Sequence, residues 1–455
     1  MNKQLDLILF TAIVLSISIS VYAQDAHYWT QTYGTRSTLL GGAVIGSVDD
    51  LGATFYNPGK LSLTNDPNFL FSARVFEFKN LSIEPNDGLS EGASKSQFKP
   101  SPSFIVFNLS SDWLGKSNFA FSFLTRQTFE TRLKTRYVGA SESSDISNEI
   151  LYEGDADEYW GGLTWSYPFY GKNELGFGIS NYFAVRSYRS RNSINIQLQD
   201  SLSNVGVLSG TREFDYYNVR ILWKAGIGFT FESIRFGLTI TTPSLNLFGS
   251  GETDINLHSS GVDIDGDNLP DEFLISDYQI DLSSEYNSAF AFGIGIYYSF
   301  SDFKVHLAGE YYSRVNKFNV LTTNNFKSQT GDISLTNHLT HALKPVLNYG
   351  MGIEYIINKK FTAYGAFVTD FSALDRDIRS NHSVASWNFY HLTGGAALTF
   401  DKFELTFGLS FAFASDNILI PMIPLTPGEE IDFIYQQQNA EISSMRIKLI
   451  LGLTF

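Results

Sequence analysis

Long stretches of this chain alternate between large apolar residues and small or polar ones. In segment 403–413 every odd position is Phe or Leu, and every even position is Glu, Thr, Gly, Ser or Ala. Segments 289–300 and 175–183 show the same split. A period of two is the repeat of a β-strand, whose successive side chains point to opposite faces of a sheet. The pattern therefore predicts strands with one large apolar face and one face that lines a cavity or water.

Three two-residue turns test this register: Glu232-Ser233, Ser301-Asp302 and Asp401-Lys402. A hairpin loop of two residues places the residues that flank it opposite one another, on the same face of the sheet. The flanking pairs are Phe–Ile at 231/234, Phe–Phe at 300/303 and Phe–Phe at 400/403. The apolar faces of consecutive strands therefore coincide and form one continuous surface.

The same reasoning predicts fourteen strands along the chain. Short turns and longer polar loops alternate between them, and the strand count is even, as is typical of a bacterial outer-membrane barrel. We therefore expect an all-β fold, a 14-stranded antiparallel transmembrane β-barrel, with both chain ends on the periplasmic, short-turn side. The expected strands cover residues 67–84, 100–111, 116–140, 150–169, 172–200, 208–231, 233–257, 275–300, 302–322, 343–357, 359–374, 386–400, 402–414 and 439–455.

Composition supports this class and argues against others. Only 17% of residues are charged while 15% are aromatic, which suits a protein whose outer surface faces lipid. The net charge of −15 argues against a nucleic-acid partner, because no basic stripe could neutralise phosphates. Cysteine is absent, and none of the seven His lies in a motif that would activate a nucleophile, so we expect no enzyme. A soluble β-sandwich would not explain large apolar residues on one face of nearly every strand.

The first 66 residues do not follow the strand pattern. Residues 1–23 have a basic end at Lys3, an apolar core at 7–19 and a Val-Tyr-Ala cleavage signal, so we expect a signal peptide cut after Ala23. Residues 24–66 are rich in small residues and turns, and we expect them to form an N-terminal hatch inside the barrel. The barrel itself then spans 67–455.

The expected hatch carries three short motifs: Gly41-Gly42, Asp49-Asp50 and Asn57-Pro58. Together they resemble the hatch of the FadL family, outer-membrane transporters of long-chain fatty acids and aromatic hydrocarbons. That family has Asn-Pro-Ala where this chain has Asn-Pro-Gly59. Glycines permit close backbone packing, and an Asn-Pro pair favours a stiff turn. We expect the aspartates to accept hydrogen bonds from backbone amides or to pair with inward cations, rather than to contact a ligand.

The resemblance implies passive, hatch-gated uptake of hydrophobic small molecules such as long-chain fatty acids. The apolar hatch residues that could line a substrate pocket are Leu39, Leu40, Ile45, Leu51 and Phe55. The alternative is a non-transporting FadL-like barrel that serves as an accessory or scaffold of a surface secretion system. An apolar, ligand-sized cavity under the hatch would favour transport. A lumen filled by inward side chains would favour the scaffold; those expected inside are Tyr182, Tyr297, Arg186 and Lys304.

A side exit is harder to place from the sequence. In the FadL family an inward kink in the third strand opens a lateral gap, but the third expected strand has no Gly or Pro between 118 and 136. Pro243 cannot donate to a strand ladder, so it marks either a break in the seventh expected strand or simply the upper end of that strand.

Two outer loops hold further candidates. Asp263, Asp265, Asp267 and Asp271 have the spacing of an oxygen-ligated Ca²⁺ loop, although Leu274 stands where a bidentate Glu would be expected. A solvated acidic loop explains them equally well. The apolar run around Ile418, Ile420 and Ile423 is expected either to fold over the barrel mouth or to form a landing surface for substrate.

Overall fold

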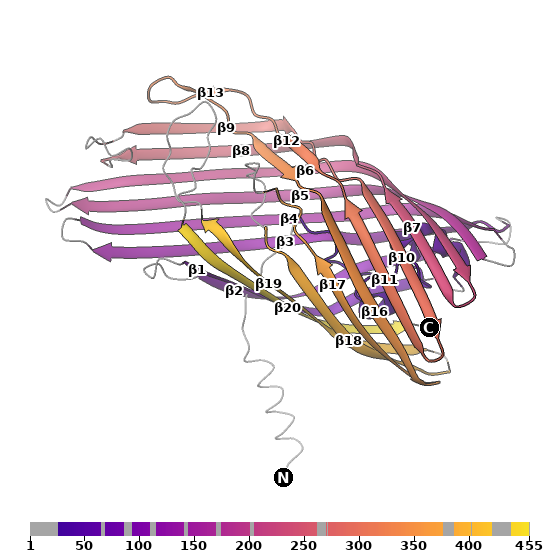
Figure 1. Ribbon diagram of the computed structural model, residues 1–455. Helices are drawn as coiled ribbons and strands as arrows, with labels where there is room; N and C mark the ends of the chain where they lie inside the picture. Colours follow the sequence, from indigo (N-terminus) through magenta and orange to yellow (C-terminus); the bar gives the residue numbers. More distant parts are fainter. Residues whose placement is uncertain are drawn as a thin grey trace, which may run out of the picture.

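The computed structural model describes residues 26–64, 69–85, 93–109, 115–140, 144–169, 174–200, 204–261, 270, 272–375, 386–401, 403–420 and 438–454. The expected signal peptide lies outside these residues. Most of the described chain is antiparallel β-sheet (Figure 1). Within the described ranges, no helix is both long and apolar enough to cross a membrane.

Strands of three kinds can be distinguished. The wall strands are β1 (Phe69–Pro85), β2 (Ala93–Asn108), β3 (Asn118–Ala140), β4 (Ser144–Phe169), β5 (Glu174–Asp200), β6 (Val205–Phe231), β7 (Ile234–Thr241), β10 (Ala291–Phe300), β11 (Phe303–Tyr312), β16 (Val346–Asn358), β17 (Phe361–Asp370), β18 (Phe389–Thr399), β19 (Glu404–Ile420) and β20 (Gln438–Thr454). Two strands branch from β6: β8 (Leu245–Ser260) and β9 (Phe273–Ser283). Two short pairs stand apart: β12 (Val315–Leu321) with β15 (Leu339–Leu343), and β13 (Phe326–Lys327) with β14 (Ser334–Leu335).

The wall strands close into a ring. The main sheet contains sixteen strands, in the order β5-β4-β3-β2-β1-β20-β19-β18-β17-β16-β11-β10-β7-β6-β8-β9, and β6 also pairs with β5. That additional pairing joins the two sides of the sheet, so that within the described residues β8 and β9 lie outside a ring of fourteen strands. Closure matters because a barrel in lipid cannot leave backbone hydrogen bonds unmade at an open edge.

Large apolar side chains point outward from the wall, as the alternation predicts. In β19, Leu405, Phe407 and Leu409 are 36–55% exposed, whereas Thr406 between the first two, and Ala412 farther along the strand, are buried. The hairpin register is also confirmed, since 231 pairs with 234, 300 pairs with 303, and the amide of 400 donates to the carbonyl of 403. Glu232 and Ser301 have φ of 49° and 53°, as tight two-residue hairpins require.

Three expected strands prove to be broken. Expected strand 233–257 divides into β7 and β8 around Pro243, which has no N–H for the ladder. The lower half of β6 pairs with β7 and its upper half with β8, so Pro243 marks a break rather than a strand end. Expected strands 275–300 and 302–322 divide in the same way, into β9 and β10 and into β11 and β12.

The strand β19 continues to Ile420, six residues beyond its expected end at 414. Ile418 and Ile420 therefore belong to the wall, paired opposite Ala440 and Gln438 of β20, and not to an outer loop. The loop prediction for these two residues is wrong, because the backbone pairing of β19 with β20 continues past the point where the side chains of β19 turn polar. Ile423 lies outside the described residues.

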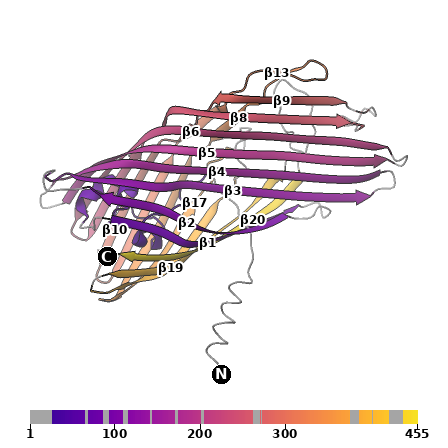
Figure 2. The same cartoon turned by 180° about the vertical axis from the view of Figure 1, so that it is seen from behind.

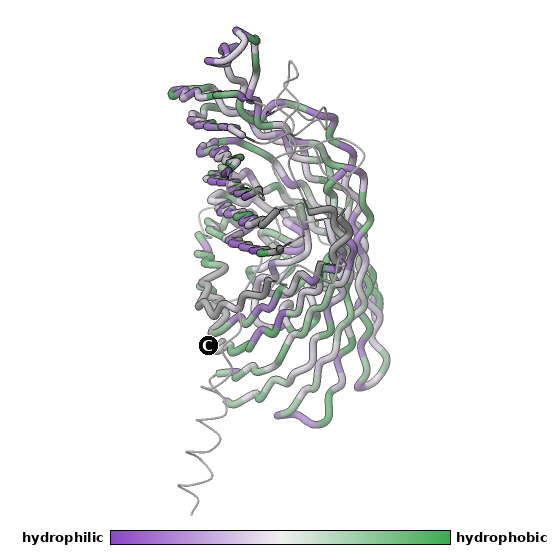
Figure 3. Tube along the Cα trace, turned by 90° about the vertical axis from the view of Figure 1, so that its left-hand side faces the viewer, coloured by the Kyte–Doolittle hydropathy of each residue, from purple (hydrophilic) through white to green (hydrophobic). Residues whose placement is uncertain are grey.

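One side of the barrel is much taller than the other. Strands β3–β6, β8 and β9 extend far beyond the rest, and hydrophilic residues dominate their outer ends in Figure 3. Cross-strand ion pairs line the outward face there, including Arg132–Glu153 at 2.9 Å and Arg191–Glu213 at 3.0 Å. Exposed pairs of this kind contribute little stability, but they show where the apolar band of the wall ends.

The pairing between β2 and β3 ends early. It runs from Asn108 opposite Ala120 to Phe104 opposite Leu124, and no further pairing of the two strands occurs in the described chain. Immediately beyond Leu124, β3 has a bulge between Thr125 and Gln127 that places Arg126 out of the regular alternation. Bulges bend a strand and redirect a side chain. The third strand therefore separates from its neighbour without the Gly or Pro that the sequence argument required.

Candidate functional site

The N-terminal segment (residues 26–64) lies inside the barrel, near the short-turn end where the C-terminus also lies (Figures 1 and 2). It contains α2 (Thr35–Leu39), α3 (Ala53–Tyr56) and the 3₁₀ helix η1 (Pro58–Leu63), joined by tight turns. The η1 helix packs against β4, β5 and β6, and α2 packs against β17–β20. Gly41 and Gly42 have φ of 63° and 80°, a conformation that favours glycine.

Asn57 fixes this segment to the wall. Its side-chain amide donates to the Ile45 carbonyl at 2.9 Å and to the Ile227 carbonyl of β6 at 3.0 Å. Its Oδ1 accepts from the Gly59 amide at 3.1 Å, which caps η1 with Pro58 at the first position. One side chain thus joins two turns of the segment and one wall strand.

Glycines on the inner face of the wall make room for this turn. A Cβ at Gly176, Gly178 or Gly226 would lie 2.1–2.3 Å from an atom of Asn57, Pro58 or Gly59, and a Cβ at Gly237 would lie 2.0 Å from the Ile45 carbonyl oxygen. The contact is equally close from the other side, because a Cβ at Gly59 would lie 2.5 Å from the Gly226 carbonyl oxygen. The wall can therefore hold the segment at backbone contact distance only because both surfaces lack side chains.

The acidic pair is held by polar contacts within the barrel. Asp49 pairs with Arg36 at 2.7 Å, and Arg36 in turn pairs with Glu354 of β16 at 2.8 Å. Asp50 accepts from the Gly52 amide at 2.8 Å. Burial, followed by the neighbouring charge of Asp49, raises the pKa of Asp50 to about 7.

The five expected pocket residues do not gather around one cavity. Leu39, Leu40 and Leu51 are at most 1% exposed; Leu39 and Leu40 pack against wall glycines, and Leu51 belongs to the main apolar cluster of the segment. Ile45 and Phe55 line a small void of about 20 Å³ together. Phe55 also reaches the larger cavity described next, whereas the other four do not line it.

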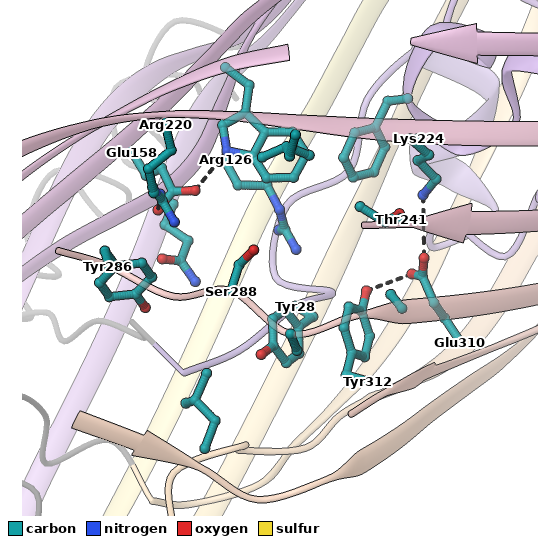
Figure 4. Close-up of a pocket in the computed structure, with 17 residues that line it drawn as sticks. Tyr28, Arg126, Glu158, Arg220, Lys224, Thr241, Tyr286, Ser288, Glu310 and Tyr312 are labelled. Atoms are coloured by element: carbon teal, nitrogen blue, oxygen red, sulfur yellow. Dashed lines mark hydrogen bonds and ion pairs between the residues drawn. The ribbon is translucent and has the colours of Figure 1, made fainter. Parts of the chain in front are cut away.

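The cavity lies above the N-terminal segment and measures about 60 Å³. Its wall combines aromatic and charged side chains, which include Tyr28, Phe55, Arg126, Glu158, Trp160, Arg220, Lys224, Tyr286, Glu310 and Tyr312 (Figure 4). A water needs roughly 10–15 Å³ of such space, so the cavity could hold a few waters or one small polar group. It is too small for an entire long-chain lipid.

Two carboxylates organise the charges of the cavity. Glu158 accepts from the Trp160 indole at 2.6 Å and pairs with Arg220 at 2.7 Å. Arg186, from β5, also pairs with Glu158, at 3.2 Å. At the other end, Glu310 pairs with Lys224 at 3.3 Å and accepts from the indole of Trp29 and the hydroxyl of Tyr312. Figure 4 shows these two groups on opposite sides of the cavity.

Inward side chains and a returning segment fill the lumen around this cavity. Tyr182, Tyr297 and Arg186 are at most 5% exposed, and Lys304 reaches Glu354. Towards the outer end, β12 and β15 contribute Val320, Leu321 and Leu339 to an apolar cluster with Tyr188 and Phe214 of the tall wall. The described conformation is therefore closed, with no large apolar pocket among the cavities that surround the segment.

Sequence reasoning did not identify the charged cavity. Arg220, Leu222 and Lys224 alternate on the inward face of β6, so the row of charges could have been found by reading inward positions alone. The bulge at Arg126 and the early end of β2–β3 pairing have no clear signal in the residues. The four aspartates of the expected calcium loop lie outside the described residues, and within the described ranges no group of three or more His, Asp or Glu side chains could hold a metal ion.

Comparisons with known proteins support the fold only through structure. No family model matches the sequence, and no curated protein matches it either. A Pseudomonas aeruginosa FadL homologue superimposes with a TM-score of 0.55 at 12% identity, covering 96% of this chain and 99% of that one. The Pseudomonas putida toluene transporter TodX gives 0.52 at 14% identity, with 94% and 98% covered. A mutant of the monoaromatic hydrocarbon channel TodX gives 0.55 at 15% identity, with 94% and 100% covered.

These superpositions span nearly the whole of every chain compared, so the likeness extends to the complete architecture. Identities of 12–15% are too low to carry residue roles from one chain to another. The superpositions, together with the closed ring and its outward apolar band, establish that this chain has the fold of the FadL-type outer-membrane β-barrels.

Proposed function

We propose that this barrel admits hydrophobic small molecules across the outer membrane by passive diffusion, with the N-terminal segment as its gate. The observation that carries the proposal is the separation of β2 from β3 beside the interior cavity. Arg126 and Gln127, the second and third residues of β3 past its last pair with β2, both line that cavity.

The N-terminal segment occupies the unpaired edge of β3. The Tyr33 hydroxyl donates to the Thr125 carbonyl at 2.9 Å, and the Gln127 side chain donates to the His27 carbonyl at 3.2 Å. The first bond satisfies a backbone carbonyl of β3 just past its last pair with β2, and the second ties a β3 side chain to the segment. A shift of the segment would release them and open a lateral path from the cavity to lipid.

We propose long-chain fatty acids as the substrates. The lumen would let them pass through and would not store them. The solved structures of the same fold include a toluene transporter and a monoaromatic hydrocarbon channel, so neutral aromatic hydrocarbons are the competing class. The barrel would reside in the bacterial outer membrane, with lipid and a hydrophobic small molecule as its partners and no cofactor needed for passage.

A reversible lock tests the gate, because the chain has no native cysteine. Ser62 of the segment and Ser166 of β4 are buried neighbours, with the Ser62 amide donating to the Ser166 hydroxyl at 3.2 Å. We expect S62C/S166C to lose fatty-acid uptake when oxidised and to regain it when reduced. The matched control is T393C/S410C, which replaces two hydroxyls that lie 3.0 Å apart across β18 and β19 and so joins two wall strands without tying the segment to either. Equal uptake by oxidised and reduced S62C/S166C would contradict the gate.

A non-transporting scaffold is the second candidate, and the filled lumen is the observation that favours it. With Tyr182, Tyr297 and Arg186 all buried, the closed barrel resembles a rigid support. None of the three solved structures described above is named for a secretion partner. Fatty-acid uptake, measured in cells that lack other uptake pathways, distinguishes the transporter from the scaffold. If the barrel is a scaffold, cells with it should take up no more than cells without it.

Two proposals remain from the sequence, one for an outer loop and one for the apolar run that begins at the outer end of β19. We propose that Asp263, Asp265, Asp267 and Asp271 bind Ca²⁺, and that the apolar run from Ile418 to Ile423 receives substrate at the barrel mouth. Charged substitutions at Ile420 and Ile423 should then reduce uptake at low substrate concentration. Unchanged uptake in folded I420E/I423E barrels would contradict the landing role.

A further inference from the structure

The tall part of the wall is an open sheet that ends in two edge strands, β3 and β9. Its spatial order is β3-β4-β5-β6-β8-β9, and Figure 2 shows β3 as the lowest of these long strands. Beyond Leu124, no strand of the described chain pairs with β3 on the side away from β4. Among the described residues, β3 therefore lacks a neighbouring strand on this side from Thr128 to Ala140.

The opposite edge of the sheet, β9, is covered by the chain itself. The Gln329 amide donates to the Leu274 carbonyl at 3.0 Å, and the Leu274 amide donates to the Thr330 hydroxyl at 3.0 Å. The Gln329 side chain bonds to both backbone groups of Ser276, at 2.7 and 2.8 Å. Proteins cover edge strands in this way because unpaired N–H and C=O groups are a template for another strand. Within the described chain, one edge of the sheet is covered and the other is open.

The backbone groups on the open edge can be assigned from the lower part of β3. The carbonyls of Phe119 and Thr125 accept from the Leu109 amide and the Tyr33 hydroxyl, so the odd-numbered residues there face away from β4. The bulge between Thr125 and Gln127 adds one residue and reverses this order. Beyond it, the even-numbered residues from 128 to 138 direct their N–H and C=O groups to the open edge.

Charge on the outward face of this sheet alternates from strand to strand. Above Glu130, the outward charged residues are Arg132, Lys134 and Arg136 on β3, Glu149 and Glu153 on β4, and Arg191 on β5. Ion pairs join the neighbours: Arg132–Glu153 at 2.9 Å, Lys134–Glu149 at 2.7 Å and Arg191–Glu213 of β6 at 3.0 Å. Opposite charges directly across neighbouring strands are favourable, and like charges are not. A strand added beside β3 therefore continues the alternation if its outward side chains are acidic.

A second copy of this barrel does not fit the open edge. Its β9 is already covered at Leu274 and Ser276, so it could offer only its own β3, and two rows of cations would then face each other. Two barrels in one membrane have the same orientation, so the two β3 strands would also run parallel. The strands of the tall sheet pair antiparallel throughout. The cations of β3 therefore select against self-association as well as for an acidic partner.

We propose that the open edge of β3 binds an extended acidic segment of another protein by strand addition, at the outer end of the barrel. Main-chain hydrogen bonds to the even-numbered residues supply the affinity, and carboxylates at alternate positions face Arg132, Lys134 and Arg136. The side chains of Arg132 and Lys134 are 60% and 52% exposed, so a partner strand can reach them without repacking the sheet. This surface lies outside the lumen and does not depend on the uptake function.

Binding of labelled peptides to the purified full-length barrel in detergent, followed by fluorescence anisotropy, tests the proposal. The probe is a peptide of about ten residues that alternates Thr and Glu, and its counterpart alternates Thr and Lys. We expect the Thr-Glu peptide to bind at least about tenfold more tightly. The variant R132Q/K134Q/R136Q should lose that preference. The control R189Q removes an exposed cation of the same face from β5, which is not an edge strand, and should keep it.

A second pair of variants separates strand addition from simple charge attraction. K134P and K134Q both remove the cation, but only proline also removes the N–H on the open edge, a position where a sheet tolerates proline. Loss of one such hydrogen bond should weaken binding of the Thr-Glu peptide by about a further fivefold in K134P.

Each of four results would overturn the proposal. Equal binding of the two peptides would exclude an acidic partner, and equal binding by K134P and K134Q would exclude strand addition. Dimers of the unmodified barrel in light scattering that are lost in K134P would assign the edge to a second copy. Displacement of the Thr-Glu peptide by phosphatidylglycerol in mixed micelles would assign the cations to anionic lipid. None of these results would bear on uptake, which the cysteine lock tests separately.

Discussion

Replacing Gly59 by alanine tests whether the N-terminal segment is held by backbone contact with the wall. The new methyl carbon would lie 2.5 Å from the Gly226 carbonyl oxygen and 2.7 Å from the Gly176 carbonyl oxygen. Both atoms belong to wall backbone that is paired on each side, so no flexible side chain can give way. The segment itself must therefore move away from the wall.

Overpacking of this kind typically costs about 1–3 kcal/mol. If the whole penalty applies to the state in which the segment contacts the wall, the population ratio of bound to displaced segment decreases by about 5- to 150-fold. Pro58 and Asn57 would move with the methyl group, so the Asn57 bonds to Ile45 and Ile227 should weaken as well. The wall pairings lie outside the contact and should stay intact.

Hydrogen exchange measured by mass spectrometry in detergent reports this ratio, because displaced backbone amides exchange. We expect peptides that cover residues 45–62 to lose protection in G59A while peptides from β18 and β19 keep it. The matched control is G394A, since a Cβ at Gly394 meets no atom within 4 Å. Protection of the segment in G59A equal to that in G394A would refute the close-contact reasoning.

Three other predictions follow from polar groups. Folding raises the pKa of Asp50 from an ordinary value of 3.8 to about 7, so between these pH values the folded state binds one more proton than the unfolded state. Hydrogen-exchange protection of the N-terminal segment should therefore fall as the pH rises from about 4 to 7. The D50N variant should show no such dependence of protection on pH. Replacing Glu158 by Gln removes the buried charged partner of Arg220 and Arg186, and should lower the free energy of unfolding by about 3–5 kcal/mol in denaturant titrations. The control E153Q, at an exposed pair with Arg132, should lower it by less than about 1 kcal/mol. Similar losses in both variants would contradict the role of Glu158 as a buried ion-pair partner. Isothermal titration should detect Ca²⁺ binding at millimolar concentrations that is abolished in D263N/D265N, and no heat above that of the variant would exclude the calcium loop.

The strand pattern in the sequence was sufficient to predict the barrel wall. Alternation along 403–413 reflects two environments, lipid outside and lumen inside, and each residue responds to its own side independently of distant partners. The short hairpins fix register locally, so 231/234 and 300/303 could be paired without knowledge of the rest. Even the N-terminal motifs are local, since Gly41, Gly42 and the Asn57-Pro58 turn depend on backbone conformation that their own residues favour.

Only the tertiary structure decided where the wall breaks and which charges meet. Pro243 could equally have been a strand end, until the pairing of β6 with both β7 and β8 showed the break. The bulge at Arg126 lies where the pairing of β3 with β2 ends and where Tyr33, 92 residues earlier in the chain, bonds to the Thr125 carbonyl. No local pattern encodes that meeting. Arg126, Glu158, Lys224 and Glu310 come from four different strands, and their spacing in the chain says nothing about their spacing across a closed ring. A ring converts distant sequence positions into neighbours, and for that reason the cavity could be found only once the ring was closed.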